Sequence, residues 1–376
     1  MVSVLSDDFD FRIVTADRDF KDKGSYPDVV VDDWNQVGRA KVLYCSPDKR
    51  SLLFWVRLLR GIPYDVLYLN SFFDPFFTQM PLLARLLGII PRRPTILAPR
   101  GALARGALAL KAWKKKPYLG VVNTVNLYKD ITWQASSQYE AADIRRAMGE
   151  IAKRIVLAIV LAPDMPGDRV SISGIPNGGQ SPQGGALRVC FLSRICEMKN
   201  LDYALRVLAQ VKAPVIFNIY GVAEDILYWQ HCQRLIKDLP AHVVVHYHGR
   251  ISHDKVLQTL SMNELFFLPT RGENYGHVIF EALAAGLPVL ISDKTPWRNL
   301  ESLGVGWDLP LEAQERFCAV IEAQAALDNE ARAEYRRRAR EYAELTAADD
   351  QVLQDNLALF WGAITGKQII QPYLKE

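Results

Sequence analysis

Runs of apolar and β-branched residues alternate along the first half of the chain with segments whose apolar residues recur at helical spacing. The spacing predicts helices over Leu52–Arg60, Gln79–Leu87 and Tyr139–Met148. The predicted strands are Phe11–Ala16, Lys41–Cys45, Asp65–Asn70, Thr95–Pro99, Ile131–Ala135 and Ile155–Leu161. Strands that alternate with helices in this way are typical of parallel sheets in α/β proteins.

A second series of the same kind follows a segment rich in proline and glycine, Pro163–Gly185, which has the composition of an interdomain linker. Its predicted strands are Leu187–Leu192, Val215–Tyr220, Val243–His246, Glu264–Leu268 and Val289–Ile291. Its predicted helices are Leu201–Val211, Ile226–Ile236, His253–Ser261 and Gly276–Ala285. Residues 312–361 have helical spacing and contain no strand candidate. We therefore expect two doubly wound α/β domains followed by a helical tail.

Composition fits this organisation. With 376 residues, of which 49% are hydrophobic, the chain can bury the cores of two domains, and intrinsic disorder is excluded as its main state. No apolar run approaches the roughly 20 residues of a membrane-spanning helix, and the first residues do not have the pattern of a secretory signal. Five cysteines without a Cys-x-x-Cys spacing argue against a disulfide framework and structural zinc, and favour a reducing compartment.

The two halves of the chain differ in net charge. Residues 1–185 contain 25 basic and 18 acidic side chains, whereas residues 186–376 contain 20 basic and 24 acidic ones. Within the first half, Lys111–Lys116 places cations on both sides of Trp113, which suits anionic lipid headgroups. The alternative is an ordinary solvated face. Nucleic-acid binding is not expected, because the pI is only about 8.5 and no recognition motif accompanies the basic residues.

The segment from Leu265 to Ile291 contains the most informative motif. A buried strand is predicted to end at Leu268, a polar loop carries Glu273, and a helix begins near Gly276. The free amides of a helix start bind phosphate, and the spacing of His277 and Glu281 places both side chains on one helix face. Carboxylates beside such an anion site can accept hydrogen bonds from sugar hydroxyls. The motif therefore predicts a site for a sugar phosphate.

A second motif lies at the first strand-to-helix turn of the second half. Arg194 and Lys199 are five residues apart in the loop that opens the helix from Leu201, which we expect Asn200 to cap. Two cations at a helix start suit a diphosphate, and a guanidinium can hold two phosphate oxygens at once. Taken alone, this loop could equally be a solvated basic loop.

The segment Gly272–Leu290 resembles the Glu-x7-Glu motif of the family 4 glycosyltransferases, retaining enzymes of the GT-B type with two Rossmann-like domains. The resemblance implies that Glu273 binds hydroxyls of the transferred sugar and Glu281 those of the ribose, while Arg194 and Lys199 bind the donor diphosphate. A further match, Tyr247–Lys255, corresponds to residues that line the base pocket. The implied donor-binding residues are Glu281, Asn274, Tyr275, Gly276, His277, Val278, Arg250, Ile251 and Lys255.

The first half resembles the acceptor domain of the same family less closely. Segments starting at Tyr64 and Pro94 look like its fourth and fifth strands, but Arg100 stands where many members have a histidine. A cation there could still neutralise the leaving phosphate, so we include Arg100 among the catalytic candidates. The segment from Trp133 fits the sixth strand and the following helix, with Ser136 or Ser137 as its cap.

The resemblance also sets the expected domain boundaries. Residues 1–165 correspond to the acceptor-side domain, 166–186 to the linker, 187–345 to the nucleotide-sugar domain, and 346–376 to a helix that packs back on the first domain. The two domains would face each other across a cleft. The family begins with a strand and a glycine-rich turn, whereas the first strand here matches the family's second. We therefore expect one βα unit to be missing from the first domain.

The resemblance implies transfer of a sugar, with retention, from a nucleoside diphosphate sugar to a glycan or lipid-linked acceptor, as in bacterial surface-polysaccharide assembly. No cofactor is expected. Two Asp-x-Asp triplets, Asp8-Phe-Asp10 and Asp17-Arg-Asp19, lie too near the N-terminus to follow a nucleotide-binding half, so we expect a metal-independent enzyme. The expected location is cytoplasmic, with peripheral attachment to the inner face of the membrane. The alternatives are a GT-B epimerase or phosphorylase, and an inactive or truncated paralogue that binds sugar nucleotides.

Overall fold

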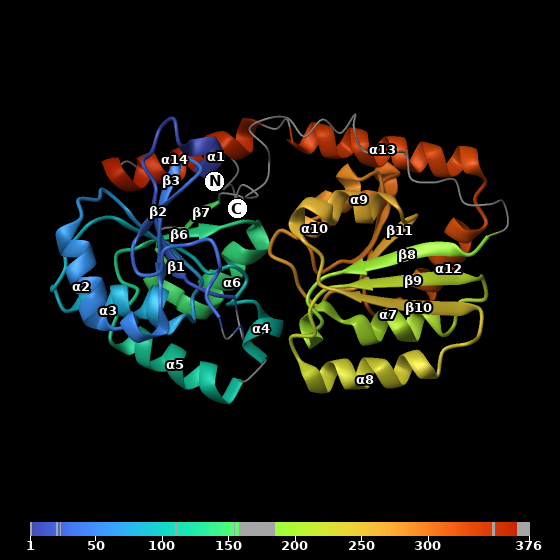
Figure 1. Cartoon of the computed structure of the whole chain (residues 1–376), viewed down its shortest axis with the longest axis horizontal. Helices are drawn as coiled ribbons and strands as arrows, with labels where there is room; N and C mark the ends of the chain where they lie inside the picture. The colour runs from blue at the N-terminus through green and yellow to red at the C-terminus, as the bar shows by residue number, and fades with distance from the viewer. Residues whose placement is uncertain are drawn as a thin grey trace. The chain divides into compact units, whose positions relative to one another are not determined.

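The computed structural model describes residues 2–19, 22, 24–109, 112–153, 155–157, 185–347 and 350–366. The chain forms two compact units, of which unit 1 comprises residues 1–168 and 350–376 and unit 2 comprises residues 169–349. Each unit combines β-sheet with helices (Figure 1). The predicted linker, residues 166–186, lies outside the described residues except for its last two positions.

Unit 2 contains one six-stranded parallel sheet with the order β10-β9-β8-β11-β12-β13. Its strands are β8 (Leu187–Leu192), β9 (Val215–Tyr220), β10 (Val243–Gly249), β11 (Leu265–Leu268), β12 (Val289–Ser292) and β13 (Gly306–Leu309). The first five confirm the predicted strands within a few residues. The sixth, β13, is missing from the prediction because its sequence, Gly-Trp-Asp-Leu, is not an apolar run.

Helices cover both faces of this sheet. In Figure 1, α7 (Leu201–Leu208) and α8 (Ile226–Lys237) lie on one side of the strands, while α9 (Val256–Ser261), α10 (His277–Ala284) and α13 (Asn329–Ala347) lie on the other. The short α11 (Leu300–Leu303) precedes β13, and α12 (Gln314–Ala325) packs against α7. The core between sheet and helices contains the fully buried side chains Phe191, Phe217, Phe266, Phe267 and Phe317.

Arginines of α13 bind the C-terminal ends of other helices in unit 2. Arg332 donates hydrogen bonds to the carbonyl oxygens of Ala325 and Leu327, at and just beyond the end of α12, each at 3.1 Å. Arg336 donates to the carbonyls of Ser261 and Asn263 at the end of α9. Carbonyls at a helix end have no partner within the helix and carry partial negative charge. The arginine-rich sequence of α13 is therefore matched to its position across these helix ends.

The strands of unit 1 form two sheets rather than one continuous sheet. One has the order β1-β3-β2, and the other is the parallel sheet β4-β5-β6-β7. Their bounds are β1 (Arg12–Ala16), β2 (Trp34–Val37), β3 (Ala40–Cys45), β4 (Leu67–Asn70), β5 (Thr95–Ala98), β6 (Thr132–Ala135) and β7 (Ile155–Leu157). β1 is one edge strand of the first sheet and β4 is one edge strand of the second, and Val14 of β1 and Leu67 of β4 pack against the same apolar cluster. The βα unit expected to be missing would fall between these two edges, and its absence stays a prediction.

The helices of unit 1 are α1 (Val2–Leu5), α2 (Leu52–Gly61), α3 (Met80–Leu86), α4 (Arg105–Ala109), α5 (Ala112–Thr124) and α6 (Gln138–Met148). The hydroxyl of Ser137 accepts a hydrogen bond from the amide of Glu140 at 3.2 Å, which confirms Ser137 as the cap of α6. The sequence did not predict α4 and α5. α5 contains Pro117, and its apolar residues lie on both its buried and its exposed side, so they do not form the single apolar stripe that predicts a helix.

The last described helix, α14 (Asp350–Thr365), belongs to unit 1. Leu359 and Phe360 are buried in one cluster with Ile96 of β5 and Leu5 of α1. The ring of Phe360 lies 5.6 Å from that of Tyr68. The N-terminal and C-terminal segments of the chain thus cover the same face of the β4–β7 sheet.

All five cysteines are free thiols, and Cys45, Cys190 and Cys232 are buried. Burial raises the pKa of Cys45 to about 11 and that of Cys232 to about 12, so both thiols are protonated at neutral pH.

Among the described residues, no helix has the length and apolar character required to cross a membrane.

Replacing Phe360 by alanine should lower the free energy of unfolding of unit 1 by about 3–5 kcal/mol, because the ring is buried and leaves a cavity. Leu345→Ala is the control, because that side chain is 73% exposed on α13 and should change stability by less than about 0.5 kcal/mol. Hydrogen exchange of the β5 amides measures unit 1 and that of the β8 amides measures unit 2. Unchanged exchange in β5 would show that α14 does not stabilise the sheet.

Candidate active site

The loops that follow β8, β9 and β10 are joined at the carboxyl edge of the unit 2 sheet, where ligands of doubly wound sheets bind. The amide of Ser193 donates to the carbonyl of Tyr220 at 3.1 Å, and the amide of Gly221 donates to that of Gly249 at 2.7 Å. Gly221 has φ +132°, and a Cβ there would overlap the carbonyl oxygen of Ser193. Only glycine therefore allows the loop carrying Arg194 to approach its neighbour so closely.

The loop after β8 is also joined to the loop after β11. Asn200, which is 2% exposed, donates from its side-chain amide to the carbonyl of Pro269 at 2.9 Å and accepts a hydrogen bond from Arg271 at 3.1 Å. The hydroxyl of Thr270 and the amide of Arg271 both donate to the carbonyl of Met198, at 3.0 and 2.8 Å. Asn200 is the N-cap residue of α7, as predicted, but its backbone is left-handed (φ +62°) and its side chain bonds to the other loop and not to the first turn of α7.

This junction brings two of the predicted site residues into contact. The ammonium group of Lys199 forms an ion pair with the carboxylate of Glu273. Their side chains are only 12% and 11% exposed, so the pair is largely withdrawn from water. The amide of Glu273 donates to the carbonyl of Lys294 at 2.9 Å, so the loop after β11 is also bound to the segment that follows β12. A cation and a carboxylate are thus held together beside the start of α10.

Arg194 lies at the surface of the same edge. Its side chain is 61% exposed, and its guanidinium donates to the carboxylate of Glu224 at 2.8 Å. Glu224 belongs to the loop between β9 and α8. The two cations predicted to bind one diphosphate are therefore each paired with a separate carboxylate.

The start of α10 has the geometry of an anion site. Gly276 has φ +79° and precedes the first helical residue, His277, whose ring lies 4.9 Å from that of Tyr275. The buried Trp297 donates from its indole nitrogen to the carbonyl of Tyr275 at 2.5 Å and fixes the approach to the helix. The segment Asn274–Val278 therefore presents the first-turn amides of α10 at the carboxyl edge of the sheet.

The predicted ribose and base contacts lie next to this helix start. The carboxylate of Glu281 on α10 lies 3.9 Å from the ring nitrogen of His253, which is in the segment between β10 and α9. In the same segment, Arg250 and Lys255 are exposed, while Ile251 packs against the core. The contact between His253 and Glu281 places the two segments beside each other, as binding of one nucleotide would require.

A separate polar network lies at the carboxyl ends of β4 and β5 in unit 1. Arg100 has a left-handed backbone, with φ +57°. Its guanidinium donates to the side-chain oxygen of Asn70 at 2.6 Å and to the hydroxyl of Tyr68 at 3.1 Å, and Tyr68 donates to Gln134 at 2.6 Å. Burial raises the pKa of the Tyr68 hydroxyl. Neither oxygen bound by Arg100 is charged, so these bonds orient the cation without neutralising it.

The buried carboxylate of Glu140 fixes the turn after Arg100. It accepts hydrogen bonds from the amide of Gly101 at 2.7 Å and from the amide and hydroxyl of Ser136 at 2.9 and 2.8 Å. The left-handed backbone of a non-glycine residue is costly and is retained only where the surroundings hold it. Arg100 therefore has a defined position at the sheet edge, as a binding residue requires.

The two Asp-x-Asp triplets have arginine or tyrosine partners. Asp17, which is 1% exposed, accepts hydrogen bonds from Arg18 and lies 3.8 Å from Arg50. The hydrogen bond from Arg18 lowers the pKa of Asp17. Asp19 accepts a hydrogen bond from Tyr26 at 2.7 Å, and Asp10 lies 3.8 Å from Arg12.

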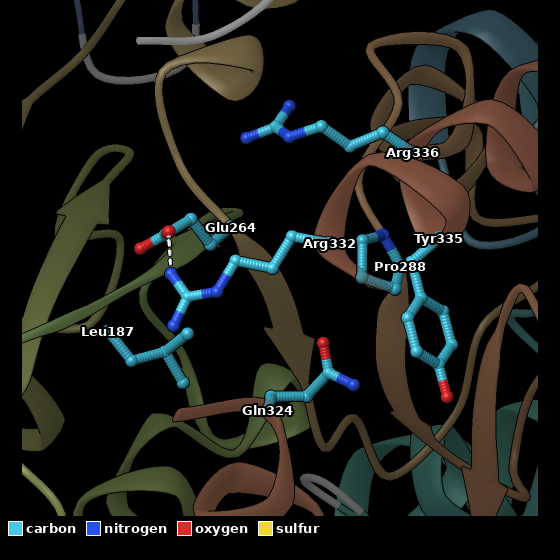
Figure 2. Close-up of a pocket in the computed structure, with 7 residues that line it drawn as sticks. All are labelled: Leu187, Glu264, Pro288, Gln324, Arg332, Tyr335 and Arg336. Atoms are coloured by element: carbon cyan, nitrogen blue, oxygen red, sulfur yellow. Dashed lines mark hydrogen bonds and ion pairs between the residues drawn. The ribbon is translucent and has the colours of Figure 1, made fainter. Parts of the chain in front are cut away.

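A pocket at the opposite, amino edge of the unit 2 sheet has a different character (Figure 2). Glu264, whose side chain is 5% exposed, forms an ion pair there with Arg332 and accepts a hydrogen bond from the amide of Arg188 at 2.8 Å. The other residues that line it are Leu187, Pro288, Gln324, Tyr335 and Arg336. The ion pair that spans this pocket joins α13 to the sheet, so we assign the pocket a structural role.

A glycosyltransferase family model matches the part of the chain that contains the unit 2 site. The family model described as Glycosyl transferases group 1 matches residues 180–345, the part of the chain that carries Arg194, Lys199, Glu273 and Glu281. No curated protein matches the chain.

Several solved structures share its fold. HepE from Anabaena, solved in complex with UDP and glucose, has a TM-score of 0.61 at 17% identity, with 86% of each chain covered. Sucrose-phosphate synthase from Thermosynechococcus elongatus has a TM-score of 0.66 at 15% identity, covering 97% of this chain and 92% of its own. WaaG, a glycosyltransferase involved in lipopolysaccharide biosynthesis, has a TM-score of 0.57 at 14% identity, with 89% of each chain covered. The fold is GT-B.

Four residues of these sites were missed by reasoning from sequence. Glu224 and His253 pair with predicted residues of unit 2, and Asn70 and Tyr68 bind Arg100 in unit 1. Asn70 ends a predicted strand, Glu224 follows one by four residues, and His253 begins a predicted helix, and these positions were the available signals. Tyr68 lies within its strand and gives no such signal.

Replacing Gly221 by alanine should destabilise unit 2 by about 3 kcal/mol or more, because alanine is strained at this φ and its methyl group would displace the loop that carries Arg194. Gly272→Ala is the matched control, since a Cβ there would meet only the Met198 sulfur, at 3.6 Å. Urea unfolding monitored by hydrogen exchange in β8 measures both variants. Equal stability of the two would show that the close approach at Gly221 is not required.

Proposed function

We propose that the protein is a retaining, metal-independent glycosyltransferase that transfers a sugar from a nucleoside diphosphate sugar to a glycan or lipid-linked acceptor. The observation that carries the proposal is the meeting of Lys199, Glu273 and the start of α10 at the carboxyl edge of unit 2. This arrangement lies within the segment that matches the glycosyltransferase family model. The complexes of HepE with UDP-glucose and with UDP and glucose support a nucleotide sugar as the donor.

In this proposal, the site stabilises the charge that develops on the leaving diphosphate. Arg194, Lys199 and the first-turn amides of α10 are positioned before the reaction, so they need little reorganisation when the bond to the sugar breaks. Lys199 is already paired with Glu273, and donor binding would share its charge between that carboxylate and the phosphate. Glu273 would then accept hydrogen bonds from sugar hydroxyls, and Glu281 from the ribose.

Arg100 of unit 1 is proposed as an additional cation for the leaving phosphate. Its hydrogen bonds to Asn70 and Tyr68 hold the guanidinium in place while leaving its charge uncompensated by those partners. Arg250, Ile251 and Lys255 are proposed to line the base pocket. We place the enzyme in the cytoplasm, at the inner face of the membrane, in bacterial surface-polysaccharide biosynthesis. WaaG, with its role in lipopolysaccharide biosynthesis, supports this assignment.

Two other functions use the same fold. A phosphorylase would need lysine-bound pyridoxal phosphate, so an absorbance spectrum without that chromophore would exclude it. An inactive paralogue would bind sugar nucleotides without turnover. Because both an enzyme and an inactive paralogue would bind the donor, only turnover distinguishes them.

Arg194→Ala should lower kcat/KM for nucleoside diphosphate release by about 100-fold or more, as expected when one preorganised donor to the leaving group is removed. The measurement uses UDP-, GDP- and ADP-sugars with a panel of glycan and lipid-linked acceptors. Glu281→Gln should raise KM for the donor, because a ribose contact is weakened.

Arg316→Ala is the matched control, because Arg316 on α12 is 55% exposed and forms an ion pair at 2.9 Å with Glu301 on α11. It should leave kcat/KM within about twofold, since exposed pairs contribute little to stability. Donor binding by the wild type without turnover on any acceptor would favour the inactive paralogue. Equal losses in both arginine variants would contradict the role of Arg194.

Treatment with EDTA should leave the rate of nucleoside diphosphate release unchanged within about twofold, because protein cations take the place of a metal at the diphosphate. Proton NMR of the first product formed should show the anomeric configuration of the donor. Loss of activity in EDTA that Mg²⁺ restores would contradict metal independence. An inverted anomer would contradict the retaining mechanism.

A further inference from the structure

The outer face of α5 in unit 1 is unusually apolar for a solvent-exposed surface. Trp113 is 74% exposed, Val121 is 61% exposed, and Val125, one residue beyond the helix, is 48% exposed. Trp113, Pro117 and Val121 are spaced four residues apart and therefore lie on one side of the helix. The opposite side is anchored by Val122, which is 3% exposed. Exposed apolar side chains gathered on one side of a helix in this way indicate an interaction surface.

Cations flank this apolar ridge. Lys114 and Lys116 are exposed on either side of it, and the Lys114 ammonium lies 4.8 Å from the centre of the Trp113 ring. Lys115 is turned toward the protein, where it donates to the carbonyl of Ala107 at 2.6 Å. The exposed lysines and Trp113 therefore lie on the same solvent-exposed surface of the helix.

The sequence around α5 contains many basic residues and no acidic residue. From Pro75 to Lys129 there are ten lysines and arginines and no aspartate or glutamate. Arg85, near the end of α3, donates to the carbonyls of Lys129 and Asp130 at 3.0 Å, so this end of α3 lies beside the turn that follows α5. Leu86 and Leu87 at that end are 38% and 58% exposed. The region thus combines positive charge with exposed apolar groups on two neighbouring helices.

We infer that the face formed by Trp113, Lys114, Lys116, Val121 and Val125, here called the α5 face, binds the surface of an anionic lipid bilayer. The lysines would contact the headgroups and the tryptophan would lie at the interface, where its amphipathic ring is favoured. A nucleic acid would satisfy the cations but not the exposed valines. The inference deepens the proposed location at the inner face of the membrane, on which it rests, by naming the surface and the class of lipid, and it is independent of the donor site.

The test is binding of the full-length protein to vesicles of phosphatidylcholine with about 30 mol% phosphatidylglycerol, a composition that gives the surface the negative potential on which juxtamembrane cations act. At low salt the protein should sediment with these vesicles, and it should remain in solution with pure phosphatidylcholine. High salt should weaken the binding, because the Debye length shortens. Failure to bind anionic vesicles at low salt would overturn the inference.

Variants test which surface is responsible. Because each juxtamembrane cation contributes about fivefold to binding, Lys114→Gln with Lys116→Gln should weaken it about 25-fold. Lys212→Gln with Lys237→Gln removes the same charge from two exposed lysines of unit 2 and should change binding by less than about twofold. Equal losses in the two double variants would contradict a specific α5 face. Unchanged thermal unfolding would show that each variant is folded.

Tryptophan fluorescence gives an independent measurement. Brominated phosphatidylcholine in the anionic vesicles should quench part of the emission of the wild type, and Trp113→Phe should abolish that quenching. Quenching that persists in Trp113→Phe would place another tryptophan at the lipid and overturn the α5 face. Nucleoside diphosphate release measured without vesicles separates the two proposals, because it reports the donor site while vesicle binding reports only this surface.

Discussion

The buried side chain of Asn200 is the junction on which the candidate donor site depends. It joins the loop after β8 to the loop after β11 through the carbonyl of Pro269 and the guanidinium of Arg271. A buried amide that lost these partners would carry a large desolvation cost, so the junction is stable only as a unit. The ion pair of Lys199 with Glu273 forms across the same two loops. The position of the charged pair is therefore set by neutral, buried hydrogen bonds.

The two edges of the unit 2 sheet have different roles for a physical reason. In a parallel α/β fold, the helix starts lie at the carboxyl edge and the helix ends lie at the amino edge, so one edge attracts anions and the other attracts cations. Arginines of α13 bind the helix ends at the amino edge, and the buried Glu264 compensates part of their charge. The pocket at that edge is thus explained by stability, and the carboxyl edge remains available for a ligand.

Unit 1 is built with less continuity than unit 2. Its strands form two sheets. One face of the β4–β7 sheet is covered by residues from both ends of the chain, with Leu5 and Phe360 in one apolar cluster. The strained turn at Arg100 is held by Glu140, and its guanidinium by Asn70 and Tyr68. These contacts give unit 1 a defined polar site despite the divided sheet.

The sequence by itself determined the class of fold, eleven of the thirteen strands in the described residues and most of the helices, because burial of one side of each element leaves a periodic pattern of apolar residues. It also identified Arg194, Lys199, Glu273 and Glu281 as candidates, because local spacing marks loops at strand ends. It did not reveal β2, β13 or α5, which lack that periodicity, nor that the side chain of Asn200 joins two loops instead of bonding to the first turn of its own helix. Those features depend on residues far apart in the chain. Only the tertiary structure decided which carboxylate each cation faces, since an ion pair such as Arg194 with Glu224 depends on how two loops meet in space.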